Sequence, residues 1–515
     1  MTHSRNGEEV SRLARQSALL VTSGVVSYAG NFVLFILLAR ALGADGFGAW
    51  AVGFAVAKTF STLGLMGADW IVLRHGSYYE GVGDVPRLRR TLHLSLRLTG
   101  AALLLLGGAV ALGAPIIAHT VFDDPGFAPL LRVAGVMIPI SGLGHLLLFG
   151  TQAFKQQNDY ALIRNLLQPL LRLACIAAAL VVARSELSAF LGLLAAESLL
   201  LVVSLGALNR RVRLVGPTKP IERRKLVRFA VPAWGTKIID TSRGQLFPIL
   251  LGTLASFSGV GAYVASQRVA IAPTAIITAM NQVYKPMGSD LFMQGRHHEF
   301  GTLFKSIGKW SFALGFPLFC LQVAFAQDIL ALFGEAFEEA EPALILLATG
   351  MLVSFGTGPV AVTLLMSGRG TLTLVNHIIV IVTEVALALL LIPPFGLIGA
   401  AVARMTGNVV NNGLGLYQVW RTTGLHPYTF DFWKPIVAGV ASTGIAWAAV
   451  HLIDLPSGLA SAAAATVLVA TTYLCLLLLF GLSKEDREAL QAIKKVRGRR
   501  PAARAPADLE TSDLA

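Results

Sequence analysis

Nine ionisable residues stand in stretches of sequence that are otherwise apolar enough to cross a membrane. An unpaired charge at the centre of a membrane helix costs about 2.5–3.5 kcal/mol, so retained charges usually face a cavity or a partner. Arginine holds a phosphate through two parallel hydrogen bonds, and lysine holds it as a point charge. We therefore expect these residues to line an internal space suited to an anionic ligand. They are Lys58, Arg172, Glu197, Lys237, Asp240, Arg243, Arg268, Glu384 and Arg404.

Three of the nine follow one another in the segment "KIIDTSRG". Lys237, Asp240 and Arg243 are spaced three apart, so they turn gradually around one side of a helix. A Lys237–Asp240 pair neutralises itself and leaves Arg243 in excess, which makes Arg243 the candidate for substrate contact. Three further charges, Asp69, Arg74 and Arg164, stand near predicted helix ends and are expected to be interfacial.

Other kinds of site have no support in the sequence. The histidines show no metal-ligand spacing, and no G-x-x-x-x-G-K-[ST] phosphate loop occurs. Cys175, Cys320 and Cys475 fall inside apolar runs and are expected to pack as small hydrophobes. The predicted external loops, of which 118–129 and 326–342 are the longest, are too short to build an active site. We therefore expect no catalytic residues, no metal and no cofactor.

Composition shows which elements carry these residues. Of 515 residues, 55% are hydrophobic and only 14% are charged, and the mean hydropathy is +0.66. A soluble protein has about a quarter charged residues, whereas a membrane helix needs about 20 mostly apolar ones. The sequence predicts an all-α polytopic membrane protein with about 14 transmembrane helices. They are Gln16–Leu38, Phe47–Ile71, Leu94–Ile117, Val133–Phe149, Leu162–Val182, Leu187–Leu208, Phe229–Leu254, Val260–Tyr284, Leu303–Phe325, Ala343–Met366, Leu372–Ile392, Leu397–Val419, Pro435–Ile453 and Leu459–Leu479.

The net charge of +13 is distributed as a topology signal and does not indicate nucleic-acid binding. Lys and Arg crowd alternate connections, including 87–90, 209–229 and the tail, while the intervening connections are acidic or neutral. Because cytoplasmic loops retain positive residues, both termini and the 209–229 connection are expected inside. The N-terminus lacks the pattern of a signal peptide, so the first helix is expected to be retained.

Two short motifs repeat along the chain. "GFGAW" (46–50) and "GVGAY" (259–263) are 213 residues apart, within the longer pair 37–60 and 249–272. Weaker echoes pair 163–180 with 374–391, opening on Asn165 and Asn376, and 192–197 with 399–404. Helices one to six thus resemble helices seven to twelve, and an even number per copy makes the repeats parallel. Such repeats place a substrate site between the halves.

The repeat predicts the domain organisation. We expect an N-terminal six-helix lobe (1–208), a basic cytoplasmic linker (209–228) and a C-terminal six-helix lobe (229–420) around a central cavity, followed by two extra helices (421–482) and a cytoplasmic tail (483–515). Glycine allows either a tight chain reversal at the membrane face or close helix packing. In the first case Trp50 and Tyr263 would anchor at the interface.

The sequence resembles a known family at these motifs. "ILLARALGADGFGAWAVGFAVAKTFSTLGLMGADWIVLRH", "VGAYVASQRVA" and "LSKEDREAL" are similar to segments of the Wzx-type polysaccharide-biosynthesis flippases of the MOP superfamily. The resemblance spans the chain. It implies transport of an undecaprenyl-pyrophosphate-linked oligosaccharide from the inner to the outer leaflet of the bacterial cytoplasmic membrane. It also implies membrane lipids, and a polysaccharide polymerase with its chain-length machinery, as partners.

Within that resemblance, Lys58 and Arg268 form a predicted clamp. With the offset of 213, Arg268 maps onto Ala55, three residues before Lys58 and on the same helix face. Two cations would then approach one pyrophosphate from opposite walls. The alternative is that each is neutralised within its own half, Lys58 by Asp69 or Glu197. Hydrogen-bonding groups for a sugar are available at Ser27, Asn31, Gln245, Gln267, Gln282, Asn408 and Asn411.

Two other functions of the superfamily remain open. A cation-coupled multidrug exporter predicts an acidic ion site in the first half, where Asp69 and Glu197 are the deep candidates. The lipid II flippases place an Arg-Asp pair in helix one, where this chain has Gly24 and Val25.

Overall fold

A computed structural model describes residues 2–154, 157–453 and 458–481 of the chain. Side chains are described in these ranges except at 2–23, 25, 157–158, 223–225, 227–229, 232–233, 236 and 240. The predicted tail (483–515) and the Asp240 side chain therefore lie outside the described residues.

The described chain is built from helices. The first half contains α1 (Thr2–Gly64), α2 (Ala68–Gly81), α3 (Val85–Thr120), η1 (Pro125–Phe127), α4 (Ala128–Thr151), η2 (Gln152–Phe154), α5 (Gln157–Ala161), η3 (Leu162–Leu167), α6 (Gln168–Val182) and α7 (Glu186–Arg211). The second half contains α8 (Arg223–Leu254), α9 (Phe257–Ala270), α10 (Thr274–Met293), α11 (His297–Ala324), α12 (Ala326–Leu330), η4 (Glu335–Ala340), α13 (Glu341–Thr357), α14 (Val360–Met366) and α15 (Gly370–Thr423). The chain continues through η5 (Phe430–Phe432), α16 (Trp433–Leu452) and α17 (Leu459–Phe480).

Ten helices of the described residues are long and apolar enough to span a membrane, or eleven if the bent pair α9–α10 is one span. This confirms the prediction of an all-helical polytopic membrane protein. Two of the ten, α1 and α15, each run through a glycine with non-helical backbone angles, Gly43 and Gly396. At these glycines each long helix divides into two arms.

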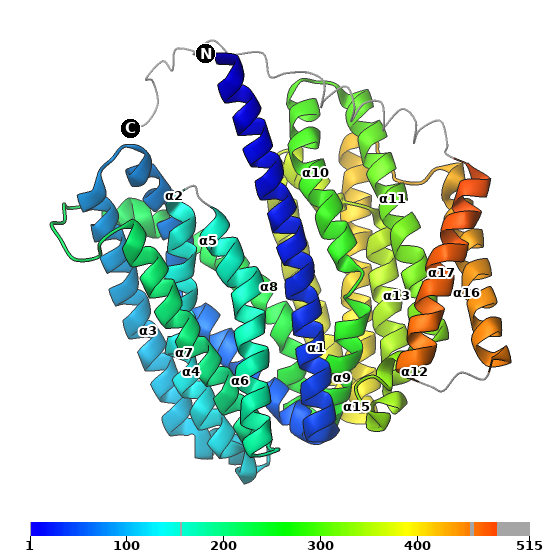
Figure 1. Cartoon of the computed structure of the whole chain (residues 1–515), viewed down its shortest axis with the longest axis horizontal. Coiled ribbons are helices and arrows are strands. Elements are labelled where there is room, and N and C mark those ends of the chain that lie inside the picture. Colours follow the sequence, from blue (N-terminus) through cyan, green and yellow to red (C-terminus); the bar gives the residue numbers. More distant parts are fainter. Residues whose placement is uncertain (1, 155–156, 454–457, 482–515) are drawn as a thin grey trace.

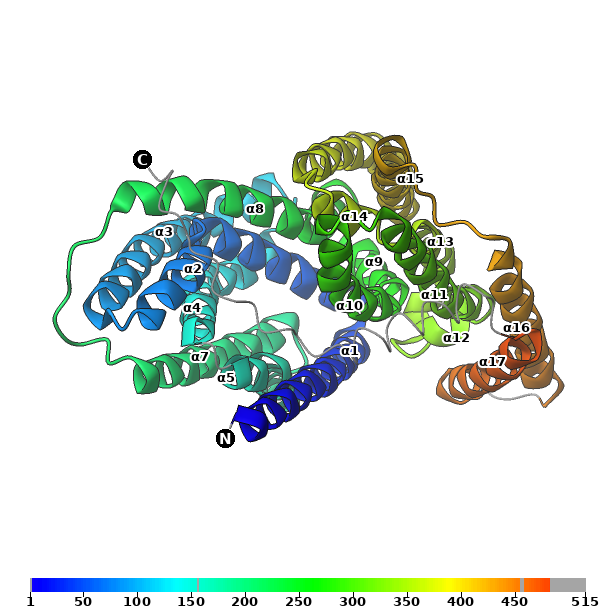
Figure 2. The same ribbon diagram turned by 90° about the horizontal axis from the view of Figure 1, so that it is seen from above.

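The helices form two groups, which we call the first and second lobes (Figures 1 and 2). Helices α2 to α7 gather on one side, and α9 to α17 gather on the other. Helices α1 and α8 run between them, and α8 packs on α1 and α2 as well as on α9 and α15. The chain start and the 212–222 connection lie at one end of the bundle, which we call the linker end; we call the opposite end the far end.

The helices pack against one another in the same order in both lobes. In the first lobe α3 packs on α4 and α4 packs on α7, and in the second α11 packs on α13 and α13 packs on α15. Glycine permits the closest approaches. A Cβ at Gly107 of α3 would lie 2.5 Å from the Gly135 carbonyl oxygen, and one at Gly135 of α4 would lie 2.6 Å from the Gly107 carbonyl oxygen. The backbones therefore touch as in other small-residue membrane interfaces.

Three of the predicted continuous spans are broken. The span 47–71 is interrupted at 65–67, the span 260–284 at 271–273, and the span 343–366 at 358–359. Gly67 and Gly358 have positive φ angles of 73° and 69°, which a side chain would strain. Pro273 stands at the interruption 271–273 and Pro359 follows Gly358 at the third; neither supplies an amide hydrogen. Broken backbone at membrane depth is tolerated where protein or an aqueous cavity surrounds it.

The expected turn at "GFGAW" is wrong. The chain reverses earlier, at Gly43 with φ 70° and ψ −178°, and in the second half it reverses between α8 and α9. Gly46, Gly48, Gly259 and Gly261 all lie inside helices. Trp50 and Tyr263 are buried, with 2% and 0% of their surface exposed, so they are core residues and not interfacial anchors. The other expectation for these glycines, close helix packing, is the one realised.

The two helix-breaking glycines generate a stability prediction. Gly43→Ala and Gly396→Ala are each expected to lower the free energy of unfolding by about 1–3 kcal/mol, because their backbone angles are accessible essentially to glycine alone. No atom lies within 4 Å of a Cβ added at either position, so the loss would report backbone strain and not a clash. Thermal unfolding in detergent measures it. Gly108→Ala on α3 also has open space but helical angles and is the control; equal stability of all three variants would contradict the strain.

Candidate functional site

A cavity of about 410 Å³ is lined by α1, by neighbouring segments of the first lobe and by one residue of α9. Both arms of α1 contribute most of its wall, η3, α6 and α7 contribute the side from the first lobe, and α9 contributes one residue from the second. Its polar uncharged residues include Ser27, Tyr28, Asn31, Asn165 and Gln168. The cavity is therefore lined mainly by the first half of the chain, and Arg268 is the one second-half residue in its described lining.

Four cations line this cavity, which we call the cationic cavity: Lys58, Arg164, Arg172 and Arg268. As far as the described residues define the wall, it contains no carboxylate. Lys58 comes from the second arm of α1 and Arg268 from α9, so the two residues of the predicted clamp come from different halves of the chain. Among the described residues neither forms an ion pair. This geometry leaves excess positive charge facing one space.

Arg268 is held without a charged partner. Its guanidinium carbon lies 4.2 Å from the centroid of the Phe35 ring, and its Nε atom is buried with no hydrogen-bond acceptor. An arginine over an aromatic face gains a cation–π interaction, but its hydrogen-bonding capacity stays unused. Such a group is suited to an anion that enters the cavity.

Arg172 is shared between this cavity and a carboxylate. It donates from Nε and Nη2 to Oε1 of Glu197 on α7, at 2.8 and 2.6 Å. Gln168 donates to the same oxygen at 3.5 Å. Glu197 lines a second, smaller cavity of about 90 Å³ that shares Lys58, Arg164, Gln168 and Arg172 with the cationic cavity. Of the nine predicted residues, the structure thus brings Lys58, Arg172, Glu197, Lys237 and Arg268 to these two adjoining cavities.

Lys237 pairs with a residue on another helix. Its ammonium donates to Oδ2 of Asp69 on α2, and its Nζ lies 3.1 Å from Nε2 of His145 on α4. Asp69 is fully buried, so the expectation that it is an interfacial residue is wrong. The reason is the break at 65–67, which starts α2 inside the bundle and not at its surface. The Asp240 side chain of the predicted Lys237–Asp240 pair lies outside the described residues.

Arg243 is not in excess. Its Nη2 lies 3.1 Å from Oε1 of Glu384, which also accepts from Arg404 at 3.1 Å. Arg404 donates in addition to the backbone carbonyl of Arg243 at 3.2 Å. Glu384 is fully buried against Gly407, where an added Cβ would lie 2.3 Å from Oε1. Glu384, Arg404 and Arg243 therefore form a structural ion-pair cluster between α8 and α15, outside the lining of the cationic cavity.

Arg164 is the cavity residue that sequence reasoning misplaced. It was expected at the interface, yet it lines both adjoining cavities. Its spacing carries a signal: Arg164, Gln168 and Arg172 are four residues apart, and residues at that interval share one helix face. A polar stripe on an otherwise apolar span indicates a face turned towards a cavity.

An apolar groove of about 470 Å³ adjoins the cationic cavity. It lies among α1, the broken pair α9–α10, α11, α12 and α17, and most of its lining is aliphatic. Phe32 lines both spaces. The charged cavity and the apolar groove therefore meet at one residue on the first arm of α1.

Comparisons with known proteins agree with this architecture. A profile described as "Polysaccharide biosynthesis protein" matches residues 13–292. Stage V sporulation protein B of Bacillus subtilis (strain 168) is 22% identical over 508 residues, covering 91% of this chain and 95% of that protein. The fold is similar to the lipid II flippase MurJ in an inward closed conformation, with 13% identity, a TM-score of 0.71, and coverage of 90% of this chain and 98% of that one. It is also similar to an inward-facing multidrug resistance MATE family transporter of the MOP superfamily, with 15% identity, a TM-score of 0.59, and coverage of 77% and 94%.

The ion-pair cluster generates a prediction. Glu384→Gln leaves two buried guanidiniums facing each other and is expected to lower the free energy of unfolding by about 3–5 kcal/mol, the usual effect of breaking a buried pair. The double variant Glu384→Gln/Arg404→Gln should lose less than the two single variants added together, because it removes the repulsion as well. Thermal unfolding of the purified wild-type protein, the two single variants and the double variant measures these losses. Strictly additive losses would mean that the residues are not coupled.

Proposed function

We propose, from the premise that the chain belongs to the polysaccharide biosynthesis protein family, that it translocates an undecaprenyl-pyrophosphate-linked oligosaccharide from the inner to the outer leaflet of the bacterial cytoplasmic membrane. The family has the fold of MOP-superfamily transporters and is not a family of enzymes. The observation that carries the proposal is the cationic cavity, with four cations and no carboxylate in its described lining.

The cations suit a pyrophosphate. An anion transferred out of water needs fixed positive partners nearby, since its hydration is lost in a low-dielectric space. Arg268 offers an unsatisfied Nε, and Lys58 adds an ammonium that is not ion-paired among the described residues. Because these two groups come from different halves of the chain, a bound pyrophosphate would be attracted to both halves at once. Arg172 and Arg164 add positive charge from the first lobe.

The remaining cavity surface suits a saccharide. Ser27 and Asn31 of the predicted sugar-contacting groups line it, and Gln168 and Tyr28 add further donors and acceptors. Trp50 and Phe54 stack nearly parallel with ring centroids 5.5 Å apart, and both belong to the lining. Hydroxyl-rich ligands are held by such hydrogen-bonding groups together with aromatic surface.

The apolar groove suits the lipid. A polyprenyl chain gains by staying in apolar surroundings while its headgroup crosses. The groove meets the cationic cavity at Phe32, so one molecule with a charged head and an apolar tail would occupy both spaces. The membrane potential favours outward movement of an anionic headgroup by about 2.3 kcal/mol per charge per 100 mV, so transport does not require ATP in principle. Membrane lipids, the polymerase and the chain-length machinery stay proposed partners.

Two alternatives within the superfamily are weaker on the same grounds. A cationic drug would meet repulsion from four positive side chains, and the two carboxylates named as ion-site candidates, Asp69 and Glu197, are paired with Lys237 and Arg172. Lipid II shares the pyrophosphate chemistry, so the cavity charge does not separate it from an oligosaccharide-lipid. The family match favours the polysaccharide precursor.

The proposal includes the predicted organisation and orientation. Fourteen spans result if each arm of α1 and α15 crosses separately, α9 and α10 form one bent span, and α8 also crosses. The lobes then correspond to 1–208 and 229–420, with the linker 209–228, the extra helices 421–482 and the tail 483–515. Because positive residues concentrate in the 209–228 linker, the linker end would face the cytoplasm.

Charge at the two clamp residues is expected to govern transport. Lys58→Arg should keep substantial activity, whereas Lys58→Gln and Arg268→Gln should each lose most of it. The reason is that a neutral amide does not compensate the negative charge of the pyrophosphate. Two assays measure this: complementation of surface polysaccharide in a deletion strain, and flipping of a polyprenyl-pyrophosphate oligosaccharide in proteoliposomes. Single cysteines at 58 and 268 should react with water-soluble thiol reagents, and substrate should protect both.

The control is Arg132→Gln, since Arg132 is exposed on α4 and does not line either cavity. It removes one positive charge without changing the site and should leave transport unchanged. If Lys58→Gln or Arg268→Gln were fully active and the matching cysteine inert, that residue would be a packing feature and the clamp would be wrong.

Orientation has a separate test. We expect a membrane-impermeant thiol reagent applied to intact cells to label a cysteine at 338 but not one at 219, because the linker end would be cytoplasmic. Permeabilised cells should label both, which shows that each position is reactive. Labelling at 219 and not at 338 in intact cells would reverse the orientation.

A further inference from the structure

The repeated glycines meet each other between the lobes. A Cβ added at Gly48 on the second arm of α1 would lie 1.7 Å from the carbonyl oxygen of Phe257 on α9. A Cβ added at Gly261 on α9 would lie 2.1 Å from the carbonyl oxygen of Ala44 on α1. Neither distance is possible for a real Cβ, so the two helix backbones touch at these points. We call this pair of contacts the glycine contact.

The glycine contact is reciprocal under the repeat. The offset of 213 residues maps Ala44 onto Phe257 and Gly48 onto Gly261. Gly48 packs on the backbone of Phe257, and Gly261 packs on the backbone of Ala44. The repeat relates these two contacts to each other. This is the geometry of a two-fold interface, in which the same patch is used on both sides. An approximate two-fold axis relating the repeats thus passes between Gly48 and Gly261.

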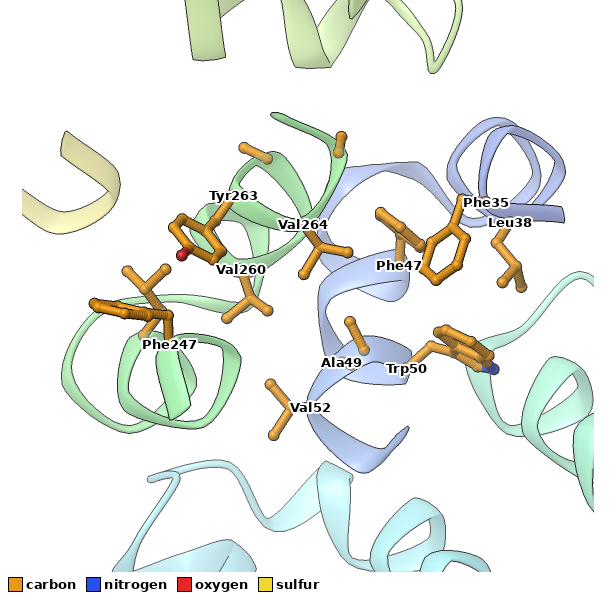
Figure 3. Close-up of a cluster of buried hydrophobic side chains, with 14 of the residues drawn as sticks. Phe35, Leu38, Phe47, Ala49, Trp50, Val52, Phe247, Val260, Tyr263 and Val264 are labelled. Carbon is orange, nitrogen blue, oxygen red and sulfur yellow. The ribbon is translucent and has the colours of Figure 1, made fainter. Parts of the chain in front are cut away.

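Aromatic side chains cover the contact from both lobes. Phe47 of α1 lies against Phe337 of η4, with ring centroids 6.1 Å apart. On the other helix, Phe257 of α9 lies against Phe127 of η1 at 4.9 Å and against Phe122 at 6.2 Å. Figure 3 shows Ala49 and Val52 on one helix next to Val260 and Val264 on the other, with Phe47 turned towards Phe35. The connections η1 and η4 therefore seal the same contact from opposite sides.

The contact lies at the far end of the bundle, beyond the cationic cavity. Arg268 is seven residues along α9 from Gly261, and Lys58 is ten residues along α1 from Gly48. At 1.5 Å per residue these separations are about 10 and 15 Å along the helices. Arg40 adds a third link at this end, since it donates to the carbonyl oxygens of Leu332 and Ala331 at 2.8 and 3.3 Å.

We propose that the glycine contact is the far-end gate of the transporter, and that the lobes close and part at Gly48 and Gly261. Backbone surfaces that touch at glycines have no interdigitating side chain to withdraw, so the lobes separate there without rearranging their own cores. An added methyl group prevents closure, because a carbonyl oxygen already occupies its position. The gate works irrespective of which substrate the cationic cavity takes.

The test measures the distance between the lobes at both ends of the bundle. Spin labels at Val121→Cys and Glu335→Cys report the far end, and labels at Tyr78→Cys and Met293→Cys report the linker end; all four positions are exposed and belong to different lobes in each pair. The native residues Cys175, Cys320 and Cys475 are replaced by alanine. Double electron–electron resonance in nanodiscs then gives the distance distribution without any transport assay.

Gly48→Ala and Gly261→Ala are each expected to shift the far-end distribution to longer distances. Overpacking a tight contact changes the ratio of two states by at least about tenfold. The linker-end distances should shorten in the same variants. The two-fold geometry predicts equal effects, and the double variant should add little, because one methyl group already holds the contact apart.

Two control variants separate a gate from ordinary packing. Gly108→Ala adds the same methyl group in open space and should change neither distance nor stability. Gly107→Ala adds it to an equally close contact within the first lobe, so it should lower the unfolding temperature without moving the lobes. Folded Gly48→Ala and Gly261→Ala proteins with wild-type distances at both ends would show that the glycine contact is incidental.

A second experiment keeps both glycines in place in case the variants fail to fold. Cysteines at Phe47 and Phe337 face each other across the gate and can be joined by a short, reducible bis-thiosulfonate reagent. The joined protein should keep the short far-end distance and lose transport, and a reductant should restore transport. Full transport by the joined protein would overturn the gate. If neither the joined nor the reduced protein transported the substrate, but both gave the expected spin-label distances, the result would count against the proposed substrate alone.

Discussion

The low dielectric of the membrane interior is the constraint on which the rest of the structure depends. Three buried carboxylates of the described residues form ion pairs at membrane depth. Each of them binds a cation on another segment. Asp69 of α2 binds Lys237 of α8, Glu197 of α7 binds Arg172 of α6, and Glu384 binds Arg243 of α8 and Arg404. Breaking such pairs leaves an uncompensated charge, so each pair fixes the helices that carry it. Lys58 and Arg268, the candidate cations that form no ion pair among the described residues, line the cationic cavity.

Helix α8 transmits that constraint between the lobes. Lys237, near its middle, is bound to the first lobe through Asp69 and His145, and Arg243 is bound to the second lobe through Glu384. Trp234 reinforces the first attachment by donating to the Leu63 carbonyl at 3.1 Å. Two attachments six residues apart to different lobes make this helix a strut between them. Relative movement of the lobes must therefore be accommodated along α8 or at one of its two ion-pair clusters.

The functional site combines three environments that one amphipathic molecule needs. Positive charge gathers on the cationic cavity, hydrogen-bonding and aromatic groups share its wall, and the apolar groove begins where Phe32 ends the cavity. The proposed gate lies beyond this site and contains touching backbones and phenylalanines, with no room for water between them at the glycines. Ligand binding and lobe closure thus use neighbouring segments of the same helices, α1 and α9, which allows a ligand in the cationic cavity to influence the gate.

The sequence by itself determined the solvent, the helix content and the internal repeat. Apolar runs of about 20 residues require a membrane, and the spacing of 213 between "GFGAW" and "GVGAY" shows the duplication without any coordinates. It also picked out five charged residues that line the two cavities, because the cost of burying a charge can be judged from local hydropathy. Lys58 and Arg268 were paired from the repeat, since equivalent helix faces in symmetric halves point towards the same space.

Only the tertiary structure decided which charge neutralises which. Lys237 binds Asp69, 168 residues away, and Arg243, which was expected to be in excess, binds Glu384, 141 residues away, because helical spacing along α8 carries no information on residues so distant in the sequence. The burial of Asp69, Trp50 and Tyr263 likewise depends on what packs around them and not on their distance from a helix end. The repeated glycines are the clearest case. Their sequence allows a turn or a close contact equally, and the contact was settled by the approach of α9 to α1, an interaction between segments that no local pattern encodes.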